Sequence, residues 1–311
     1  MIQFQLYNFQ FGKVADGGEK KLFGDTDPVM SAEEAFPRKQ ELLRGLLEDD
    51  YTGARKIRFS HRKYRKEYTH KHLMRPTDDI AVMRIANRRT ARRTDRNFKV
   101  VDEEDYPNCI VIIDNRPGIQ RLAIEAKKSV FASDTMPAEI IEHTLNALLR
   151  KYSLNICLMH LHDAEKFWSI VDDRRTYPAG FYKVKFHLPY LNLERLRKKW
   201  NGLTVQMRDS YQARMDVEMT AQKGGELKFS KDDARQAAQI SFLAEELGGD
   251  SIELVPNNNK RKTIKVGQGS YKIAWISDAT FDRLKDDAEG GDLFGGKALD
   301  TIKREMKKGI D

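Results

Sequence analysis

The stretch CIVIIDNRPGIQRLAIEAKKS, residues 109–129, decides the fold. Its two apolar runs are separated by NRPG, and because proline and glycine are turn residues the stretch predicts a β-hairpin. In the second strand Leu122 and Ile124 share one face, whereas Arg121 and Glu125 share the other. This alternation predicts an antiparallel sheet with one face in the core and one in water.

Alternating and amphipathic patterns outside the hairpin indicate further strands and helices. Strands are expected at residues 2–11, 54–68, 79–89, 152–162 and 181–191. Helices are expected after Pro37, after Pro137 and over residues 163–173. The apolar stripe of the helix after Pro137 is expected to contain Ile141, Leu145, Leu148 and Tyr152. This order predicts an α+β fold, a mostly antiparallel sheet with helices packed on it.

The pattern restarts beyond a basic stretch that ends near residue 200. We therefore expect two domains, residues 1–200 and a smaller α+β domain at residues 201–311. The elements expected in the second domain are a hairpin at 213–230 that turns at Gly224, a helix capped by Ser230, a three-stranded meander at 250–276 and a terminal helix.

Positive charge is concentrated in one part of the chain. Residues 54–99 contain 16 lysines and arginines against 4 acidic residues, a net charge of +12, whereas the whole chain carries +8. The other 265 residues therefore have a net charge of −4. A surface of one sign attracts phosphates and gains from counterion release, so this segment predicts DNA or RNA as a partner.

Side chains that can grip phosphate or stack on bases lie within residues 55–96. The expected nucleic-acid-binding residues are Arg58, Arg62, Lys63, Tyr64, Arg65, Arg84, Arg88, Arg89, Arg92, Arg93 and Arg96. Arginine dominates this set, and its guanidinium group can hold a phosphate through two hydrogen bonds at once. The alternative is a solvated face, or one that docks on an acidic protein.

The hairpin also permits a catalytic interpretation. Asp114, Glu125 and Lys127 have the order found in PD-(D/E)xK nucleases, in which two carboxylates hold Mg²⁺ and a lysine acts on the attacking water or the phosphate. Asp114 and Glu125 would then be metal ligands. The pattern is short, and a half-exposed hairpin explains the same residues, so the preferred hypothesis is a protein without a cofactor.

Histidines and cysteines give weaker patterns. The histidines of interest are His160 and His162 beside Asp163 on one expected strand, and His61, His70 and His72 within the positively charged residues 54–99. Neither group is followed by a third ligand at a spacing typical of a metal site. The two cysteines lie in apolar runs, as buried reduced thiols do. Because no long apolar run or signal sequence is present, we expect a cytoplasmic chain that does not contact membranes.

Three stretches of the sequence carry a resemblance to other proteins: YPNCIVIIDNRPGIQRLAIE, EKFWSIV and VKFHLPYLNLERL. Their hydrophobic spacing and aromatic residues, over residues 78–200, resemble a recurring skeleton of uncharacterised bacterial proteins encoded in mobile elements and anti-phage defence loci. The resemblance implies a cytoplasmic α+β protein that works beside other defence proteins. In that group the acidic residues of the hairpin have no established catalytic role.

The sequence leaves three functions open. The preferred hypothesis is a nucleic-acid-binding sensor or accessory subunit of a bacterial anti-phage defence system, a binding protein rather than an enzyme. The first alternative is an Mg²⁺-dependent nuclease of the PD-(D/E)xK type. The second alternative is a scaffold subunit whose basic face docks on an acidic partner protein or on copies of itself.

Overall fold

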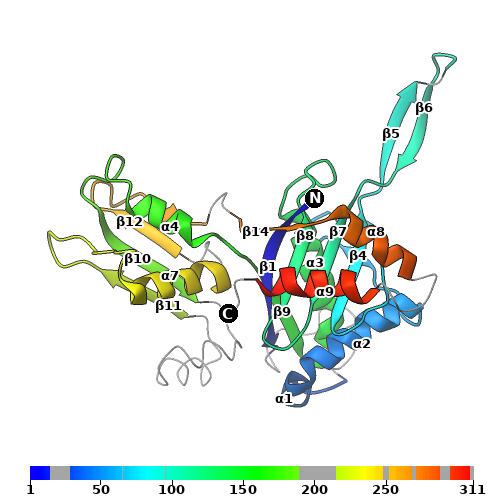
Figure 1. The fold of residues 1–311 in the computed structure, drawn as a ribbon, viewed down its shortest axis with the longest axis horizontal. Coiled ribbons are helices and arrows are strands. Elements are labelled where there is room, and N and C mark those ends of the chain that lie inside the picture. Colours follow the sequence, from blue (N-terminus) through cyan, green and yellow to red (C-terminus); the bar gives the residue numbers. More distant parts are fainter. Residues whose placement is uncertain are drawn as a thin grey trace. The chain divides into compact units, whose positions relative to one another are not determined.

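The structure is a computed structural model, and it confirms the α+β class, with helices packed on a curled antiparallel sheet (Figure 1). It describes residues 1–14, 29–64, 66–94, 96–188, 215–247, 252–267, 271–287 and 295–308. Within these residues no helix has the length and apolarity needed to cross a membrane.

The chain forms two compact units. Unit 1 contains Met1–Phe4, Lys13–Cys157 and Ala274–Ile310, and unit 2 contains Gln5–Gly12, Leu158–Ile273 and Asp311. The expected domain boundary near residue 200 lies outside the described residues. The structure divides the chain elsewhere, because the segment that begins at Ala274 returns to unit 1.

The largest sheet has eight strands. Seven follow the order β14-β1-β8-β7-β4-β3-β2, and β9 pairs with β1. The strand bounds are β1 Ile2–Lys13, β2 Phe59–Ser60, β3 Glu67–His72, β4 Ile80–Ala86, β7 Asn108–Asp114, β8 Arg121–Glu125, β9 Leu154–His160 and β14 Ile273–Ile276. The predicted hairpin is confirmed: β7 runs antiparallel to β8, and Asp114 lies opposite Arg121. The connecting turn passes through Gly118, whose positive φ of 76° suits glycine.

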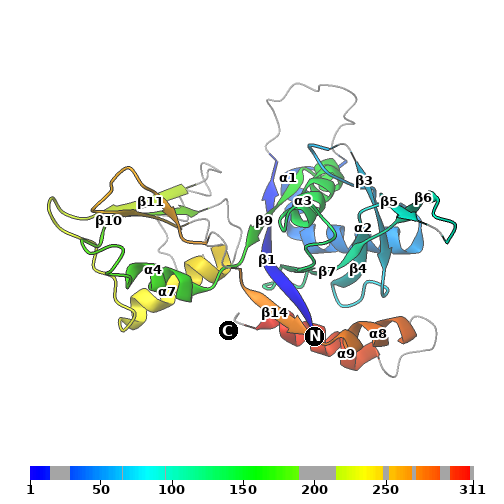
Figure 2. The ribbon, with the colours of Figure 1, turned by 90° about the horizontal axis from the view of Figure 1, so that it is seen from above.

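Both faces of this sheet are covered at its centre, where β7 and β8 lie. Figure 2 shows α8 (Asp278–Asp287) and α9 (Gly295–Lys307) on one side of it, and α2 (Lys39–Thr52) and α3 (Met136–Leu149) on the other. All of β7 after its first residue is buried, and so is β8 up to its last residue. The expectation that one face of the hairpin lies in water is therefore wrong, and the unbroken apolar run in β7 is typical of a strand buried on both faces.

The helices expected after the two prolines are confirmed. Pro37 lies in a short 3-10 helix, η1 (Phe36–Arg38), which follows α1 (Ala32–Ala35) and leads directly into α2. In α3 the stripe differs from the prediction by one residue, because Leu149 is buried whereas Leu148 is only partly buried. Leu149 follows Leu145 by four residues and so lies on the same face of α3, which ends there and is followed by a 3-10 turn, η2 (Arg150–Tyr152).

Strands β5 (Arg89–Thr94) and β6 (Val100–Asp105) form a separate two-stranded sheet. Figure 1 shows this pair, which we call the arm, extending away from the rest of unit 1. Hydrogen bonds fix its base, since Asn87 Nδ2 donates to the carbonyl of Val130 at 2.7 Å and Lys66 Nζ donates to Asn87 Oδ1 at 2.6 Å. The sequence predicted one strand over residues 79–89 and did not predict β6.

Unit 2 contains a four-stranded antiparallel sheet in the order β11-β10-β12-β13. Its elements are α4 Ala164–Val171, β10 Phe181–Leu188, β11 Met215–Thr220, α7 Ala234–Leu247, β12 Ile252–Pro256 and β13 Ile264–Lys265. The predicted helix and strand between residues 163 and 191 are confirmed, and α4 buries Phe167 and Trp168 as expected. Both helices contribute buried side chains to one hydrophobic core.

Three expectations for the later part of the chain are wrong. The expected hairpin at 213–230 is not formed in its described part, residues 215–230, because only β11 is a strand there and it pairs with β10. Asp233, not Ser230, caps α7, since its Oδ1 accepts a hydrogen bond from the amide of Arg235 at 2.9 Å. The expected meander loses its third strand, β14, which joins the largest sheet.

Two arginines of the β7–β8 hairpin attach helix α9. Arg121 is 1% exposed, and its Nη1 donates to the carbonyls of Met306 at 2.8 Å and Lys308 at 2.6 Å. Arg116 Nη2 donates to the carbonyl of Lys303 at 3.0 Å. A guanidinium group thereby supplies donors to the carbonyls that the end of a helix leaves unpaired.

We predict that Arg121→Met lowers the free energy of unfolding by about 2–3 kcal/mol, because buried carbonyls lose a charged hydrogen-bond donor. Arg304→Met is the matched control. Arg304 lies on helix α9, its side chain is 71% exposed, and the effect of its substitution should stay within about 0.5 kcal/mol. Urea unfolding of both variants measures the difference. Equal effects would contradict the anchoring role of Arg121.

Candidate functional site

Asp114 lies at the end of β7, where its carboxylate is fully buried. Both oxygens are occupied by one side chain, since Arg116 Nε donates to Oδ1 at 2.9 Å and Arg116 Nη2 donates to Oδ2 at 2.6 Å. Glu125 ends β8, and its Oε2 accepts a hydrogen bond from the amide of Ile110 at 2.9 Å. Each carboxylate therefore has its own local partner.

The structure does not bring the three predicted catalytic residues together. Asp114 lies opposite Arg121, four residues along β8 from Glu125, which corresponds to roughly 13 Å at the rise of a β-strand. Oxygens that share one Mg²⁺ each lie only about 2.1 Å from the ion. Lys127 lies beyond the end of β8 and is exposed. The residues thus do not form the common metal site that a PD-(D/E)xK nuclease requires.

Five of the predicted phosphate-binding arginines lie in the arm or at its base, and all except Arg96 are paired with an acidic residue of β6. The pairs are Arg88 with Glu104, Arg89 with Asp105 at 3.0 Å, Arg92 with Asp102 at 3.4 Å and Arg93 with Glu103 at 3.5 Å. The antiparallel register causes this, because it places the acidic strand directly opposite the basic one.

Because of these pairs, the arm carries much less net positive charge than its arginines alone would suggest. Residues 88–105 contain six basic residues and five acidic ones, a net charge of only +1. The pairs are exposed, so each contributes little to stability, yet together they cancel most of the field that would attract a phosphate. Among the other predicted residues, Arg96 is exposed near the tip of the arm, Arg84 donates to Asn108 Oδ1 at 2.8 Å, and Arg65 lies outside the described residues.

Positive charge without such partners lies around β2 and β3. Residues 53–72 contain eight basic residues and one acidic residue, a net charge of +7. Six exposed cations have no ion pair among the described residues: Arg55, Lys56, Arg58, Arg62, Lys63 and Lys71. We call these six residues the basic segment. Phe59 and Tyr68 lie opposite one another and are buried, so Arg58, next to Phe59, lies on the solvent side with Lys71.

The turn between β2 and β3 is fixed by His61. Its Nδ1 accepts hydrogen bonds from the amides of Lys63 at 3.0 Å and Tyr64 at 3.4 Å. Its Nε2 lies 3.1 Å from Glu139 Oε2 on α3. Lys63 and the exposed ring of Tyr64 are therefore presented to solvent by an ordered turn rather than by a loose loop.

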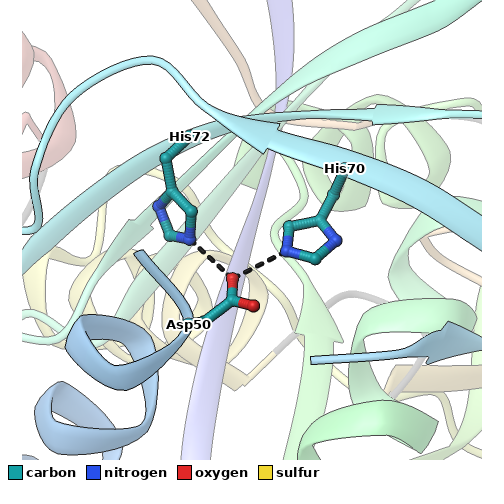
Figure 3. Close-up of side chains that lie close together, drawn as sticks. All are labelled: Asp50, His70 and His72. Atoms are coloured by element: carbon teal, nitrogen blue, oxygen red, sulfur yellow. Dashed lines mark hydrogen bonds and ion pairs between the residues drawn. The ribbon is translucent and has the colours of Figure 1, made fainter. Parts of the chain in front are cut away.

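Sequence reasoning missed a compact cluster of Asp50, His70 and His72, which Figure 3 shows in close-up. Asp50 lies in the last turn of α2, and its Oδ2 lies 2.7 Å from Nε2 of both histidines. Its other oxygen accepts a hydrogen bond from the amide of Ile57 at 2.7 Å. Burial would raise the pKa of Asp50, but these three hydrogen bonds outweigh it and lower the pKa well below its usual value.

A sequence signal for this cluster existed. Alternate residues of a strand share a face, so His70-Lys71-His72 in β3 places both imidazoles on one side. The third member of the cluster, Asp50, lies twenty residues before His70 on a helix, and only the packing of α2 against β3 brings it close. Within the part of the chain that the structure describes, this is the one group of histidine, cysteine and acidic residues whose ligand atoms converge.

The other histidine pair lies in unit 2 and forms no metal site. The His160 ring is stacked between Tyr7 and Tyr271, with ring centres 3.9 Å and 3.8 Å away. Asp163 does not join it, because Asp163 Oδ1 caps α4 by accepting from the amide of Glu165. Burial, together with nearby His162, lowers the pKa of His160 to about 3.

Comparisons with protein-family models, with curated proteins and with solved structures find no match to this chain. Its function therefore has to be inferred from its own residues.

The low pKa of His160 predicts a pH-dependent stability. The folded protein keeps this imidazole neutral, whereas the unfolded chain takes up a proton near pH 6.5. The stabilisation is therefore complete above about pH 6.5 and is lost as the pH falls towards the folded pKa. His160→Phe keeps an aromatic ring in the stack, and it should reduce the slope of unfolding free energy against pH by up to about 1.4 kcal/mol per pH unit. Urea unfolding between pH 4.5 and 6.5 tests this, and unchanged slopes would contradict it.

Proposed function

We propose that this protein binds DNA or RNA through the basic segment. The observation that carries the proposal is the distribution of ion pairs: the arm arginines face carboxylates, whereas the basic segment is exposed and unpaired among the described residues. Free lysine and arginine side chains can exchange the counterions of a phosphate backbone, which is the main source of non-specific affinity for nucleic acid.

Two further features support a nucleic acid over other anions. Tyr64 is 55% exposed beside Lys63, whose Nζ lies 5.6 Å from the centre of the Tyr64 ring, so a base could stack next to a phosphate contact. The cations also lie on one chain segment held by β2, β3 and the His61 turn, and an ordered surface loses little entropy on binding.

The proposed biological role rests on the resemblance of the sequence to defence-locus proteins. We propose that the chain is a sensor or accessory subunit, in which nucleic-acid binding reports foreign DNA or RNA to a second protein. The arm supports the existence of that second partner, because it exposes several large apolar side chains. These are Phe98, Val100 and Val101, and Tyr106 directly after β6 is exposed as well. A scaffold that docks only on proteins remains the second candidate function, since exposed apolar groups of this kind favour protein contacts.

We predict that neutralising Arg55, Lys56, Arg58 and Arg62 together as glutamines weakens binding to DNA or RNA by roughly 10²–10³-fold at 0.15 M salt. With all six cations engaged on duplex DNA, the slope of log affinity against log salt should be about −5, and the variant should reduce it to about −2. Fluorescence anisotropy with labelled duplex and single-stranded oligonucleotides, over a salt series, measures both quantities.

The matched control removes both members of two arm pairs, as Arg92→Gln with Asp102→Asn and Arg93→Gln with Glu103→Gln. This control removes two positive and two negative charges, so the net charge is unchanged, and its affinity should stay within about threefold of the natural protein. Loss of binding in the control with retention in the first variant would contradict the proposal. Absence of any binding to nucleic acid at low salt would leave the scaffold as the better function.

A further inference from the structure

We propose that Asp50, His70 and His72 bind a divalent transition-metal ion, of which Zn²⁺ is the representative. Two imidazole nitrogens and one carboxylate form a ligand set that suits Zn²⁺, Co²⁺ or Fe²⁺ far better than Mg²⁺ or Ca²⁺, which prefer oxygen. The three ligand atoms all lie within 4.8 Å of one another. This site is independent of the proposed function, because it would exist whether or not nucleic acid binds.

The geometry directs both nitrogens to one point. Nε2 of His70 and Nε2 of His72 each lie 2.7 Å from the same oxygen, Asp50 Oδ2 (Figure 3). An ion about 2.1 Å from both nitrogens would sit close to the present position of that oxygen. A small withdrawal of the carboxylate would then complete a three-ligand site, in which water fills the open positions.

Electrostatics also favour a cation here. The Asp50 side chain is 1% exposed, and it lies in the last turn of α2, where the helix dipole is unfavourable for a negative charge. Among the described residues, its ion pairs are with His70 and His72 only, and an imidazole supplies a positive charge only when it is protonated. A divalent ion would neutralise the buried carboxylate without requiring a protonated histidine.

The surroundings leave the ligands ready for metal. Asp50 Oδ1 is already held by the amide of Ile57, the kind of second contact that orients a metal ligand. His72 Nδ1 is buried and has no hydrogen-bond partner among the described residues, so the ring proton is held on Nε2 by Asp50 alone, the contact that a metal ion would replace. The Phe59 ring packs against His70 and the Tyr51 ring against His72, at 4.8 Å and 5.7 Å between ring centres, which limits ligand motion.

The ion would close a loop of the chain. Asp50 and His70 lie at the two ends of the stretch that carries β2, the His61 turn and most of the basic segment. A bound ion would join the end of α2 directly to β3. It would therefore reduce local unfolding of the residues between Asp50 and His70. Metal binding should therefore slow amide exchange in residues 51–69.

The test uses the full-length protein, stripped of metal by a chelator and dialysed, with Co²⁺ and Zn²⁺ as probes. All samples carry Cys157→Ser, because the exposed thiol of Cys157 could bind either ion. We expect visible Co²⁺ absorption at one equivalent, displacement of that absorption by Zn²⁺, a rise in Tm with Zn²⁺, and slower hydrogen–deuterium exchange over residues 51–69.

His72→Gln should weaken Co²⁺ affinity by at least about 100-fold, since the loss of a direct ligand costs more than the loss of an outer contact. Asp50→Asn provides a second variant if either one folds poorly, and circular dichroism checks the fold of both. His143→Gln, a histidine on α3 outside the cluster, is the matched control and should bind like the parent protein. No stoichiometric binding, or equal binding by the parent and a folded His72→Gln variant, would overturn the proposal.

Discussion

Burial of both faces of the largest sheet at its central strands, β7 and β8, is the constraint on which the rest of unit 1 depends. Because β7 and β8 have helices on each side, every charged group inside must find a partner within the protein. Asp114 binds Arg116, Arg121 binds the carbonyls at the end of α9, and Asp50 binds two histidines. In the hairpin that resembles a nuclease motif, Asp114 is thus paired with Arg116, and Arg116 and Arg121 attach helix α9.

Charged side chains without a partner in the core lie at the surface, and two clusters of them, the arm and the basic segment, differ in net charge. The arm balances its own charge, because a basic strand and an acidic strand lie opposite each other in register. At the edge of the sheet, around β2 and β3, the six cations of the basic segment have no ion pair among the described residues, so they keep most of their field. Electrostatic recognition of nucleic acid is thus expected at the sheet edge, and contact with another protein at the arm.

Local signals in the sequence predicted much of the fold and little of the candidate sites. The apolar runs around NRPG gave the central hairpin, and proline positions gave the starts of α2 and α3. The sequence did not reveal that both faces of the hairpin are buried, because that depends on α8 and α9 returning from the end of the chain. VVDEED at residues 100–105 has the composition of a solvated loop, so its pairing with the arginines of β5 was missed. The Asp50 cluster was missed because its members are joined by packing rather than by spacing.

The position of the nucleic-acid contact can be measured directly by hydrogen–deuterium exchange of the full-length protein with and without a bound oligonucleotide. If free charge decides the contact, exchange should slow in residues 53–72, while the arm at residues 88–105 exchanges as before. Protection confined to the arm, with residues 53–72 unchanged, would show that the arginine–carboxylate pairs open to hold phosphate. That result would contradict the assignment of binding to the basic segment.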